Sequence, residues 1–544
     1  MREGKPGIAR WAFWAGLILA AAGIAAFLWY RGQGPALDLS LSVQGLPPAS
    51  QPQTVDLANG AKFTLVASPV TKKIGTTIVR ELGYNGSSPG PFLRVHQGDQ
   101  VEITLVNHCG LPTTIHHHGV RVENSFDGVP DVTQKAVPPG KSFVYRVRFP
   151  DPGIYWYHPH FREDYAQELG LFGVYLVAPS EANYWPPANR EVVLTLHDLL
   201  LKDGKIPEYL PDRVNFAFMG RFGNTILVNG QTDYKLELKK GEVVRFYLLN
   251  ASSARPYRLF IPGAKMKLVG GDNGRVDHEV FLDALVIAPS ERWIVDVFFP
   301  QPGTYKLTHH AEDPLVGPRT YELATFQVSG DAASPSYEKE FLVLRENQPE
   351  KALFDQLVAK YRDARPEKTL RLTVDATPAA IQGVATAESP EAAQARQQLF
   401  LGMLTALVKK GAKVEWEDHM YQANKSSTSK DVHWKLVDLS TGASGEAIQG
   451  WDFSRDGYLF LRLINDIHSL HPMQHPIHIH GQRFLVLATN AEENKLRVWK
   501  DTVQVGAGDT VDLLVELSNP GKWMAHCHIL EHLHSGMFLV FRVN

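Results

Sequence analysis

Four pairs of histidines, each with one residue between its members, are the first feature of the sequence that suggests chemistry. They are His116/His118, His158/His160, His478/His480 and His526/His528. On a β-strand, residues two apart point to the same face, so each pair presents two imidazoles on one side. Neutral imidazole is a ligand for copper, zinc and iron. Because eight imidazoles exceed what one ion needs, we predict a site for several metal ions if the pairs meet.

The C-terminal segment carries a second kind of ligand set. Cys527 lies between two histidines and faces away from them on a strand. With His475, His532 and a weak axial Met537, it gives the His₂Cys plus Met set of a blue electron-transfer copper. Since His526 and His528 flank Cys527, electrons entering here have a short covalent route to the multinuclear site. This arrangement suits delivery of several electrons to one acceptor, and we infer that dioxygen is the acceptor.

These residues belong to a pattern that occurs three times along the chain. An alternating strand that ends on asparagine occurs at 98–107, 241–250 and 456–465. A Pro-Gly pair follows at 152–153, 302–303 and 520–521, and His158, Thr308 and His526 follow these pairs at the same spacing. Matched spacing in two separate patterns indicates three related domains. Runs of strands with few long helices favour β-sandwiches, so we predict an all-β protein.

We place the three domains at residues 50–182, 188–330 and 340–544. The first two histidine pairs fall in the first domain and the last two in the third, so these domains must pack together to form the multinuclear site. The middle domain has Thr308 in place of a histidine, and we expect a spacer without a copper site. The third domain is longer, and we place its extra residues at about 346–440. Apolar periodicity predicts helix there at 352–364 and 392–410.

The N-terminal segment predicts export. Residues 1–10 are basic, and residues 11–30 are uncharged. Such a run spans about 30 Å as a helix, enough to cross a bilayer, and basic residues before it favour a cytoplasmic N-terminus. We therefore predict an N-terminal transmembrane helix at 11–30 that anchors an exported body on the periplasmic or extracellular face. A cleaved signal peptide is the alternative.

Charge and cysteine content exclude other classes. Lys plus Arg total 55 against 58 Asp plus Glu, a balance that leaves no dominant cationic surface for nucleic acid. Two cysteines exclude a disulfide framework. We expect Cys109 to be a buried free thiol and the protein to be a monomer.

The four histidine motifs resemble those of three-domain multicopper oxidases, which include bacterial laccases and cuprous oxidases. The likeness rests on residues 114–119, 156–160, 475–481 and 526–537. It implies cupredoxin-like β-sandwich domains and four copper ions. The type 1 copper would be held by His475, Cys527, His532 and Met537, and the type 2 copper by His116 and His478. The pair of type 3 coppers would be held by His118, His158, His160, His480, His526 and His528. Because every ligand position is filled, the likeness argues against a copper-free scaffold of this fold.

Several residues near the motifs need separate interpretation. Asp127 stands where the family carries a carboxylate close to the type 2 copper, and we expect it to relay protons for O₂ reduction; a structural role in a turn is the alternative. His117 replaces the usual Trp, and strand alternation turns it away from the cluster. Leu533 and His534 replace acids that some relatives place near the proton path. Glu531 is expected to be a supporting or surface residue.

The resemblance implies an oxidase that couples one-electron oxidations to four-electron reduction of O₂ to water. Soft thioethers suit Cu(I), but the chain has only eight Met, so we favour phenols or aromatic amines over Cu(I) or another metal ion as donor. We expect the insertion to cover part of the type 1 edge. A non-enzymatic copper carrier is a further alternative. A zinc enzyme would leave the Cys–His–Met set without a role, and a copper nitrite reductase would have fewer domains.

Overall fold

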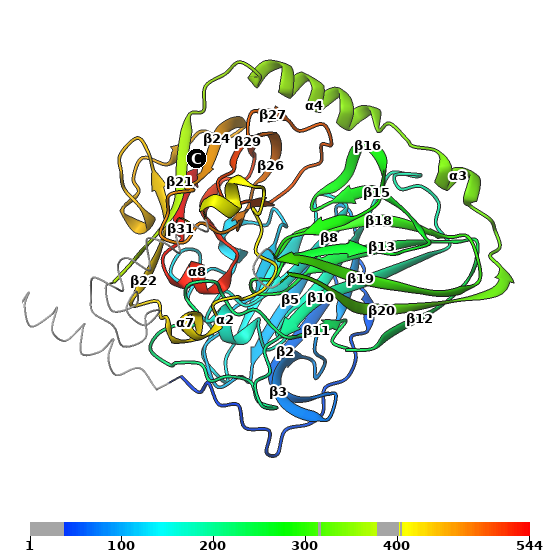
Figure 1. The fold of residues 1–544 in the computed structure, drawn as a ribbon, viewed down its shortest axis with the longest axis horizontal. Helices are drawn as coiled ribbons and strands as arrows, with labels where there is room; N and C mark the ends of the chain where they lie inside the picture. Colours follow the sequence, from blue (N-terminus) through cyan, green and yellow to red (C-terminus); the bar gives the residue numbers. More distant parts are fainter. Residues whose placement is uncertain (1–36, 314–316, 378–401, 403–404) are drawn as a thin grey trace, which may run out of the picture.

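The computed structural model describes residues 37–313, 317–377, 402 and 405–544 (Figure 1). The predicted transmembrane helix at 11–30 and most of the predicted helix at 392–410 lie outside the described residues. Within the described part of the chain, no helix is both long and apolar enough to span a bilayer. Six β-sheets and a few short helices make up these residues, which confirms the prediction of an all-β protein.

Two of the sheets belong to the N-terminal part of the chain. One has the order β3 (Thr77–Tyr84), β2 (Lys62–Ile74), β5 (Gln100–Asn107), β7 (Ser142–Arg148). The other has the order β1 (Thr54–Asp56), β4 (Phe92–His96), β9 (Gly173–Ala178), β8 (Gly153–His158), β6 (His116–His118). Both sheets contribute to one hydrophobic core, as in a β-sandwich. The second sheet places the first two histidine pairs on or just after its strands β6 and β8.

The next two sheets form a second sandwich. One has the order β11 (Thr225–Val228), β10 (Arg190–Leu199), β13 (Glu242–Asn250), β18 (Arg292–Phe299), β15 (Lys265–Gly271), β16 (Gly274–Leu282). Its partner has the order β12 (Tyr234–Lys240), β20 (Gly317–Ala332), β19 (Gly303–Asp313), β14 (Tyr257–Phe260), β17 (Leu285–Ile287). Their inner faces share a separate apolar core.

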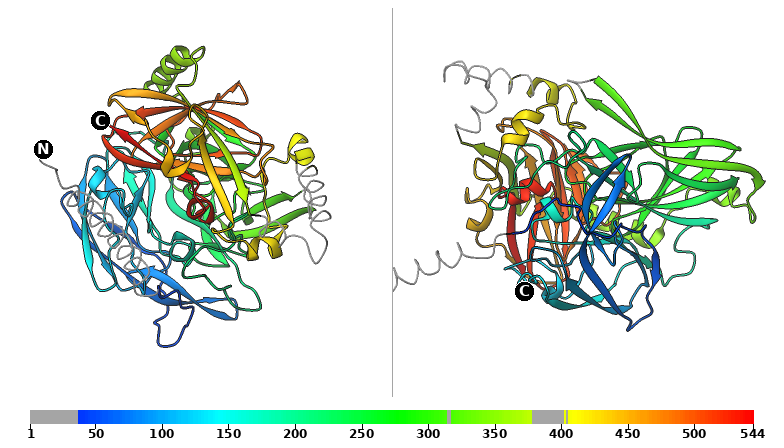
Figure 2. Two further views of the ribbon diagram at one scale, coloured as in Figure 1. Left: turned by 90° about the vertical axis from the view of Figure 1, so that its left-hand side faces the viewer. Right: turned by 90° about the horizontal axis from the view of Figure 1, so that it is seen from below.

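The last two sheets carry the remaining motifs. One has the order β22 (Val432–Asp438), β21 (Lys368–Ala376), β24 (Gly457–Asn465), β29 (Thr510–Leu517), β26 (Arg483–Thr489), β27 (Glu492–Glu493). The other has the order β23 (Asp452–Phe453), β31 (Phe538–Val543), β30 (Gly521–Cys527), β25 (His475–Ile479), β28 (Thr502–Val505). Figure 2 shows these C-terminal strands, in orange and red, against the N-terminal strands in blue and cyan.

The repeated asparagine ends an equivalent strand in each sandwich. Asn107, Asn250 and Asn465 are buried at the ends of β5, β13 and β24. The amide of Asn107 donates to the carbonyls of Leu111 and Val137, and that of Asn465 donates to the carbonyls of Met473 and Val505. These two amides therefore stabilise the segments that precede the histidine strands β6 and β25. In the first and last sandwiches the asparagine thus anchors the residues just before a histidine strand.

The residues at about 346–440, which we expected to be extra in the third domain, do not form a single unit in the structure. Helix α4 (Gln348–Tyr361) overlaps the predicted helix at 352–364 and packs its apolar residues on β24, β26 and β29 (Figure 1). Strands β21 and β22 then pair within the sheet, β21 parallel to β24. The residues between these two strands include the short helix α7 (Tyr421–Ser426). Other short helices are α2 (Glu163–Ala166), α3 (Glu338–Leu342) and α8 (Leu530–His534).

Candidate metal centres

The four histidine pairs meet between the first and last sandwiches. Strand β6 pairs antiparallel with β8, which places His116 opposite His158. In the same way β25 pairs with β30, which places His478 opposite His526. The eight imidazoles are nearly or fully buried, and they form three groups whose ligand atoms lie within 4.8 Å of one another. The groups are His116, His118 and His478; His118, His158 and His528; and His160, His480 and His526. Since each group draws on both sandwiches, the site exists only when the two pack together.

Hydrogen bonds to protein oxygens orient these imidazoles. Nδ1 of His116 donates to the carbonyl of Asp127 over 2.7 Å, and Nδ1 of His478 donates to the carbonyl of Asp501 over 2.9 Å. Nδ1 of His160 lies 2.8 Å from a carboxylate oxygen of Glu163. The Nε2 atoms of these three histidines are buried and have no hydrogen-bond partner among the described residues. Such a set of unpaired nitrogens is what metal-binding histidines present, because one nitrogen is fixed and the other is left for the ion.

Electrostatics keep the cluster in the form that binds metals. Burial lowers the pKa of His158, His480, His526 and His528 well below the ordinary value, and the neighbouring imidazoles lower it further. At neutral pH these rings are therefore uncharged. Neutral imidazole is the ligand form for copper and other transition metals.

A separate group of candidate ligands, outside the histidine cluster, consists of His475, Cys527 and His532. This group is also fully buried. Sγ of Cys527 lies 3.6 Å from Nδ1 of His475 and 3.7 Å from Nδ1 of His532, and these two nitrogens are 3.3 Å apart. Met537 is buried in the same core, and its carbonyl accepts the backbone N–H of Cys527. One sulfur and two nitrogens facing one point suit a soft metal ion such as copper.

The two centres are joined through Cys527. Its neighbours His526 and His528 belong to two different groups of the cluster. In addition, Nδ1 of His526 donates to the carbonyl of Cys527 over 2.8 Å. The structure therefore connects the sulfur of Cys527 to the cluster by covalent bonds and by one hydrogen bond.

Carboxylates contact several of the cluster histidines, and two of them are Asp127 and Glu163. Asp127 is buried, and one of its oxygens accepts from Nδ1 of His480 over 3.0 Å, while its carbonyl accepts from His116. Glu163 was missed by the sequence reasoning. It accepts from Nδ1 of His160 over 2.8 Å and from Nε2 of His534 over 2.6 Å. Its only sequence signal was a position three residues after His160.

The edge of the sulfur-containing group is covered by other parts of the chain. Nε2 of His532 donates to the carbonyl of Phe218 over 3.1 Å, and its ring stacks on Trp434. The segment around Phe218 is held by the insertion, since Asn424 and Ser427 accept the backbone N–H groups of Met219 and Phe218. The expected cover by the insertion is therefore present. The middle domain is more than a spacer, because Phe218 belongs to it.

Three other residues discussed in the sequence analysis lie away from the clustered nitrogens. His117 is turned to the opposite side, where Nδ1 contacts the hydroxyl of Tyr175 over 2.9 Å and the ring packs on Tyr145. Cys109 is a buried free thiol whose pKa burial raises to about 12, so it is unreactive. Glu531 is buried and accepts from the hydroxyl of Ser253, so it is a supporting residue.

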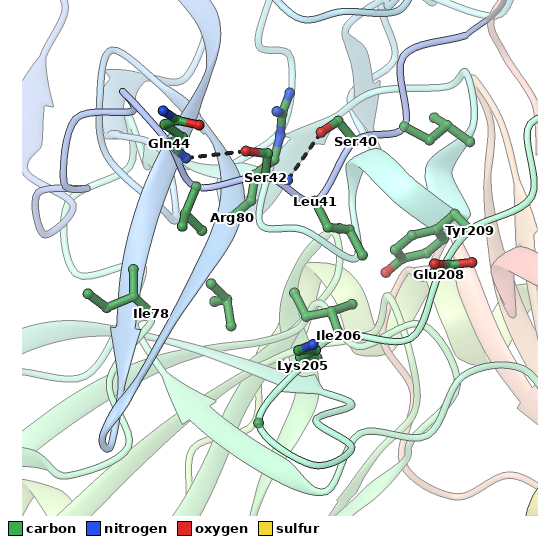
Figure 3. A pocket seen from close by; sticks show the side chains of 14 residues that line it. Ser40, Leu41, Ser42, Gln44, Ile78, Arg80, Lys205, Ile206, Glu208 and Tyr209 are labelled. Carbon is green, nitrogen blue, oxygen red and sulfur yellow. Dashed lines mark hydrogen bonds between the residues drawn. The ribbon is translucent and has the colours of Figure 1, made fainter.

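A surface pocket of about 620 Å³ lies elsewhere (Figure 3). The N-terminal segment with Ser40, Ser42 and Gln44 forms one side, and Ile78 and Arg80 of β3 form another. None of the clustered histidines lines it. The pocket therefore does not contribute to the metal centres.

Comparison with known proteins agrees with this geometry. Sequence models of the multicopper oxidases match residues 68–182, 190–330 and 425–544. The chain belongs to the multicopper oxidase family. Members of this family are oxidoreductases that use oxygen as acceptor, and the family implies copper as cofactor. The predicted family and the prediction of an enzyme are thus confirmed.

The relatives and the similar structures cover nearly the whole chain. The chain is 26% identical to "Multicopper oxidase MmcO" of Mycobacterium tuberculosis, over 93% of this chain and 94% of the relative. It is 24% identical to "Multicopper oxidase mco" of Staphylococcus aureus, over 84% of this chain and 82% of the relative. A multicopper oxidase from Campylobacter jejuni, described as a metallo-oxidase, superposes with a TM-score of 0.66 at 24% identity and covers 93% of this chain and 99% of its own. The cupredoxin-like fold is confirmed by this likeness.

Proposed function

We propose that this multicopper oxidase takes electrons one at a time at His475, Cys527 and His532 and uses four of them to reduce O₂ to water at the histidine cluster. The observation that carries the proposal is the position of Cys527, whose two chain neighbours belong to the cluster. Four copper ions held by the two centres would supply the redox chemistry. By the family resemblance these are one type 1, one type 2 and two type 3 ions.

The residues around the ions have separate tasks in this proposal. Met537 completes the type 1 set as a weak axial ligand. Asp127 contacts both His480 and His116, so it fixes two ligands and is placed to hand protons to reduced oxygen. Nearly complete burial of the cluster excludes bulk water from the reacting oxygen.

The identity of the electron donor is a separate question. The covered edge of the group formed by His475, Cys527 and His532 favours a small donor. His475 and His532 are at most 1% exposed, so an aromatic ring has no direct contact with either imidazole. Phenols and aromatic amines, which the scarcity of methionine favours, would have to pass electrons through the segment at Phe218. We therefore place a metal ion such as Cu(I) first and an aromatic donor second.

A specific pair of side chains supports the metal-ion donor. Nε2 of His471 lies 3.6 Å from a carboxylate oxygen of Glu415, and both of these buried atoms lack a hydrogen-bond partner among the described residues. The ring of His471 is 6.4 Å from that of Trp434, which in turn contacts the rings of His475 and His532. Imidazole binds copper and iron and a carboxylate binds harder ions, so this pair beside the type 1 group suits transient binding of a metal cation.

Oxygen uptake by the copper-loaded full chain tests the donor. With Cu(I) as the only donor we expect fast uptake, and with a dimethoxyphenol slow uptake. His471→Ala should lower the rate with Cu(I) about 10–100-fold and change the rate with the phenol little, as expected when a metal ligand is lost. Equal rates of wild type and variant with Cu(I) would contradict the metal-ion donor, and absence of uptake with either donor would contradict the oxidase.

We also propose that the protein is exported and anchored by residues 11–30, as a monomer. The support is the basic segment before an uncharged run long enough to cross a bilayer. Alkaline extraction of membranes should leave the full chain in the pellet and release a chain that begins at residue 37. Recovery of the full chain in the soluble fraction would contradict the anchor. Size determination in detergent tests the monomer.

A further inference from the structure

A buried ion pair joins the middle domain to the third domain beside the cluster. The guanidinium of Arg292, at the start of β18, binds both carboxylate oxygens of Asp501, with one nitrogen–oxygen distance of 2.6 Å. Both side chains are fully buried. Asn273 donates to the same carboxylate over 2.7 Å. Three donor groups of the middle domain thus hold one side chain of the third.

Asp501 is in turn bonded to two cluster histidines. Its carboxylate accepts from Nε2 of His118 over 3.1 Å, and its carbonyl accepts from Nδ1 of His478. The hydroxyl of Thr502 lies between them, 3.1 Å from His118 and 3.2 Å from His478. The two imidazoles stack with ring centres 3.7 Å apart and an interplanar angle of 14°. The orientation of both rings therefore depends on where Asp501 is held.

Further charges and a glycine fit the same arrangement. Asp272 accepts the backbone N–H of Arg292 and lies 3.3 Å from the ammonium of Lys500. Gly119, which follows His118 directly, has φ +81°, and a Cβ there would overlap the carboxylate of Asp501 and the guanidinium of Arg292. Only glycine lets the histidine strand approach this ion pair so closely.

We propose that Arg292 and Asn273 are positioning residues for His118 and His478. The middle domain supplies no clustered histidine, yet its charge sets the geometry of His478, which we assign to the type 2 copper, and of His118, which we assign to the type 3 pair. This inference rests on the proposed occupancy by copper. An interdomain ion pair with only a structural role would change stability and leave both copper centres unaltered, so the copper centres themselves decide between the two.

The test compares Arg292→Lys with a matched control in the full-length, copper-loaded protein. Lysine keeps the charge but loses the two parallel hydrogen bonds. The control is Arg245→Lys, because Arg245 forms an equally buried pair with Asp296, at 2.8 and 2.9 Å, and neither residue bonds to a clustered histidine. The measurements are the chelator concentration that removes each copper, the electron paramagnetic resonance signal of the type 2 copper and the blue absorbance.

For Arg292→Lys we expect loss of the type 2 signal at about 10–100-fold lower chelator concentration, with the blue absorbance unchanged. The control should match the wild type in both. Equal retention in Arg292→Lys and wild type, or equal loss in the control, would overturn the inference. If Arg292→Lys does not fold, Asn273→Ala removes a single donor to Asp501 and should shift the type 2 signal in the same direction. Wild type that binds no copper would instead contradict the proposed function.

Discussion

The imidazole of His532 donates its Nε2 proton to the main-chain carbonyl of Phe218, over 3.1 Å. This bond covers the edge of the group formed by His475, Cys527 and His532 with backbone from the middle domain. The closing segment is held in place by Asn424 of α7, which bonds Met219 and Gly220. We therefore expect this segment, which carries none of the clustered ligands, to influence which electron donors are oxidised.

Loosening this segment should widen the range of donors. Asn424→Ala removes the bonds that hold the segment, at a cost of about 1–3 kcal/mol in unfolding free energy. We expect kcat/KM for a dimethoxyphenol to rise several-fold, by about one order of magnitude at most. One order of magnitude corresponds to about 1.4 kcal/mol in the activation free energy. The blue absorbance should persist. Gln422→Ala on the exposed side of the same helix is the control. Unchanged phenol oxidation in a folded Asn424→Ala variant would contradict control by the cover.

Replacement of the sulfur ligand should abolish the blue colour and leave the fold intact. Cys527→Ser lacks the thiolate that a blue copper needs, so we expect loss of the blue absorbance and of turnover with near-native circular dichroism. Cys109→Ala, at the buried thiol outside both centres, should keep both properties. A blue Cys527→Ser protein would show that the copper lies elsewhere.

The carboxylate of Asp127 should govern the oxygen half of the reaction. Asp127→Asn removes the charge beside His480 and the group that hands on protons, so we expect reoxidation of the reduced enzyme by O₂ to slow by about 10²-fold or more. Reduction of the type 1 copper by the donor, followed by stopped flow through the blue absorbance, should keep its rate. An equal effect on both half-reactions would assign Asp127 to structure alone.

Stability of the copper-free protein should depend on Glu531 in a pH window. Burial raises the pKa of Glu531 from 4.5 to about 7. The unfolded chain loses this proton at lower pH than the folded chain, so stability falls as pH rises from about 4.5 to 7 and the loss is complete above 7. Glu531→Gln should therefore stabilise the protein at pH 8 and change it little at pH 4.

Urea unfolding of wild type and Glu531→Gln at pH 4, 6 and 8 measures this difference. Glu492→Gln, at an exposed glutamate, is the control and should have no effect at any of these pH values. A stability difference for Glu531→Gln that is the same at pH 4 and pH 8 would refute the raised pKa.

Local patterns in the sequence predicted much of the ligand-bearing structure. Alternation on a strand determines that His116 and His118 share a face, while His117 points to Tyr175. The repeated asparagines, such as Asn107, mark equivalent strand ends because their amides bond backbone within the same domain. These features depend on neighbours along the chain or on a repeated unit, so they are visible without tertiary contacts.

The sequence by itself determined the all-β class, the family and the candidate ligands, since these follow from residue types at fixed spacing. Only the tertiary structure decided which residues surround the ligands. It places Arg292 beside Asp501, 209 positions away in the sequence, and Phe218 beside His532, 314 positions away. No spacing rule links such pairs, because they meet only where separate sandwiches pack. For the same reason the structural role of the middle domain, which has no clustered histidine, was invisible in its sequence.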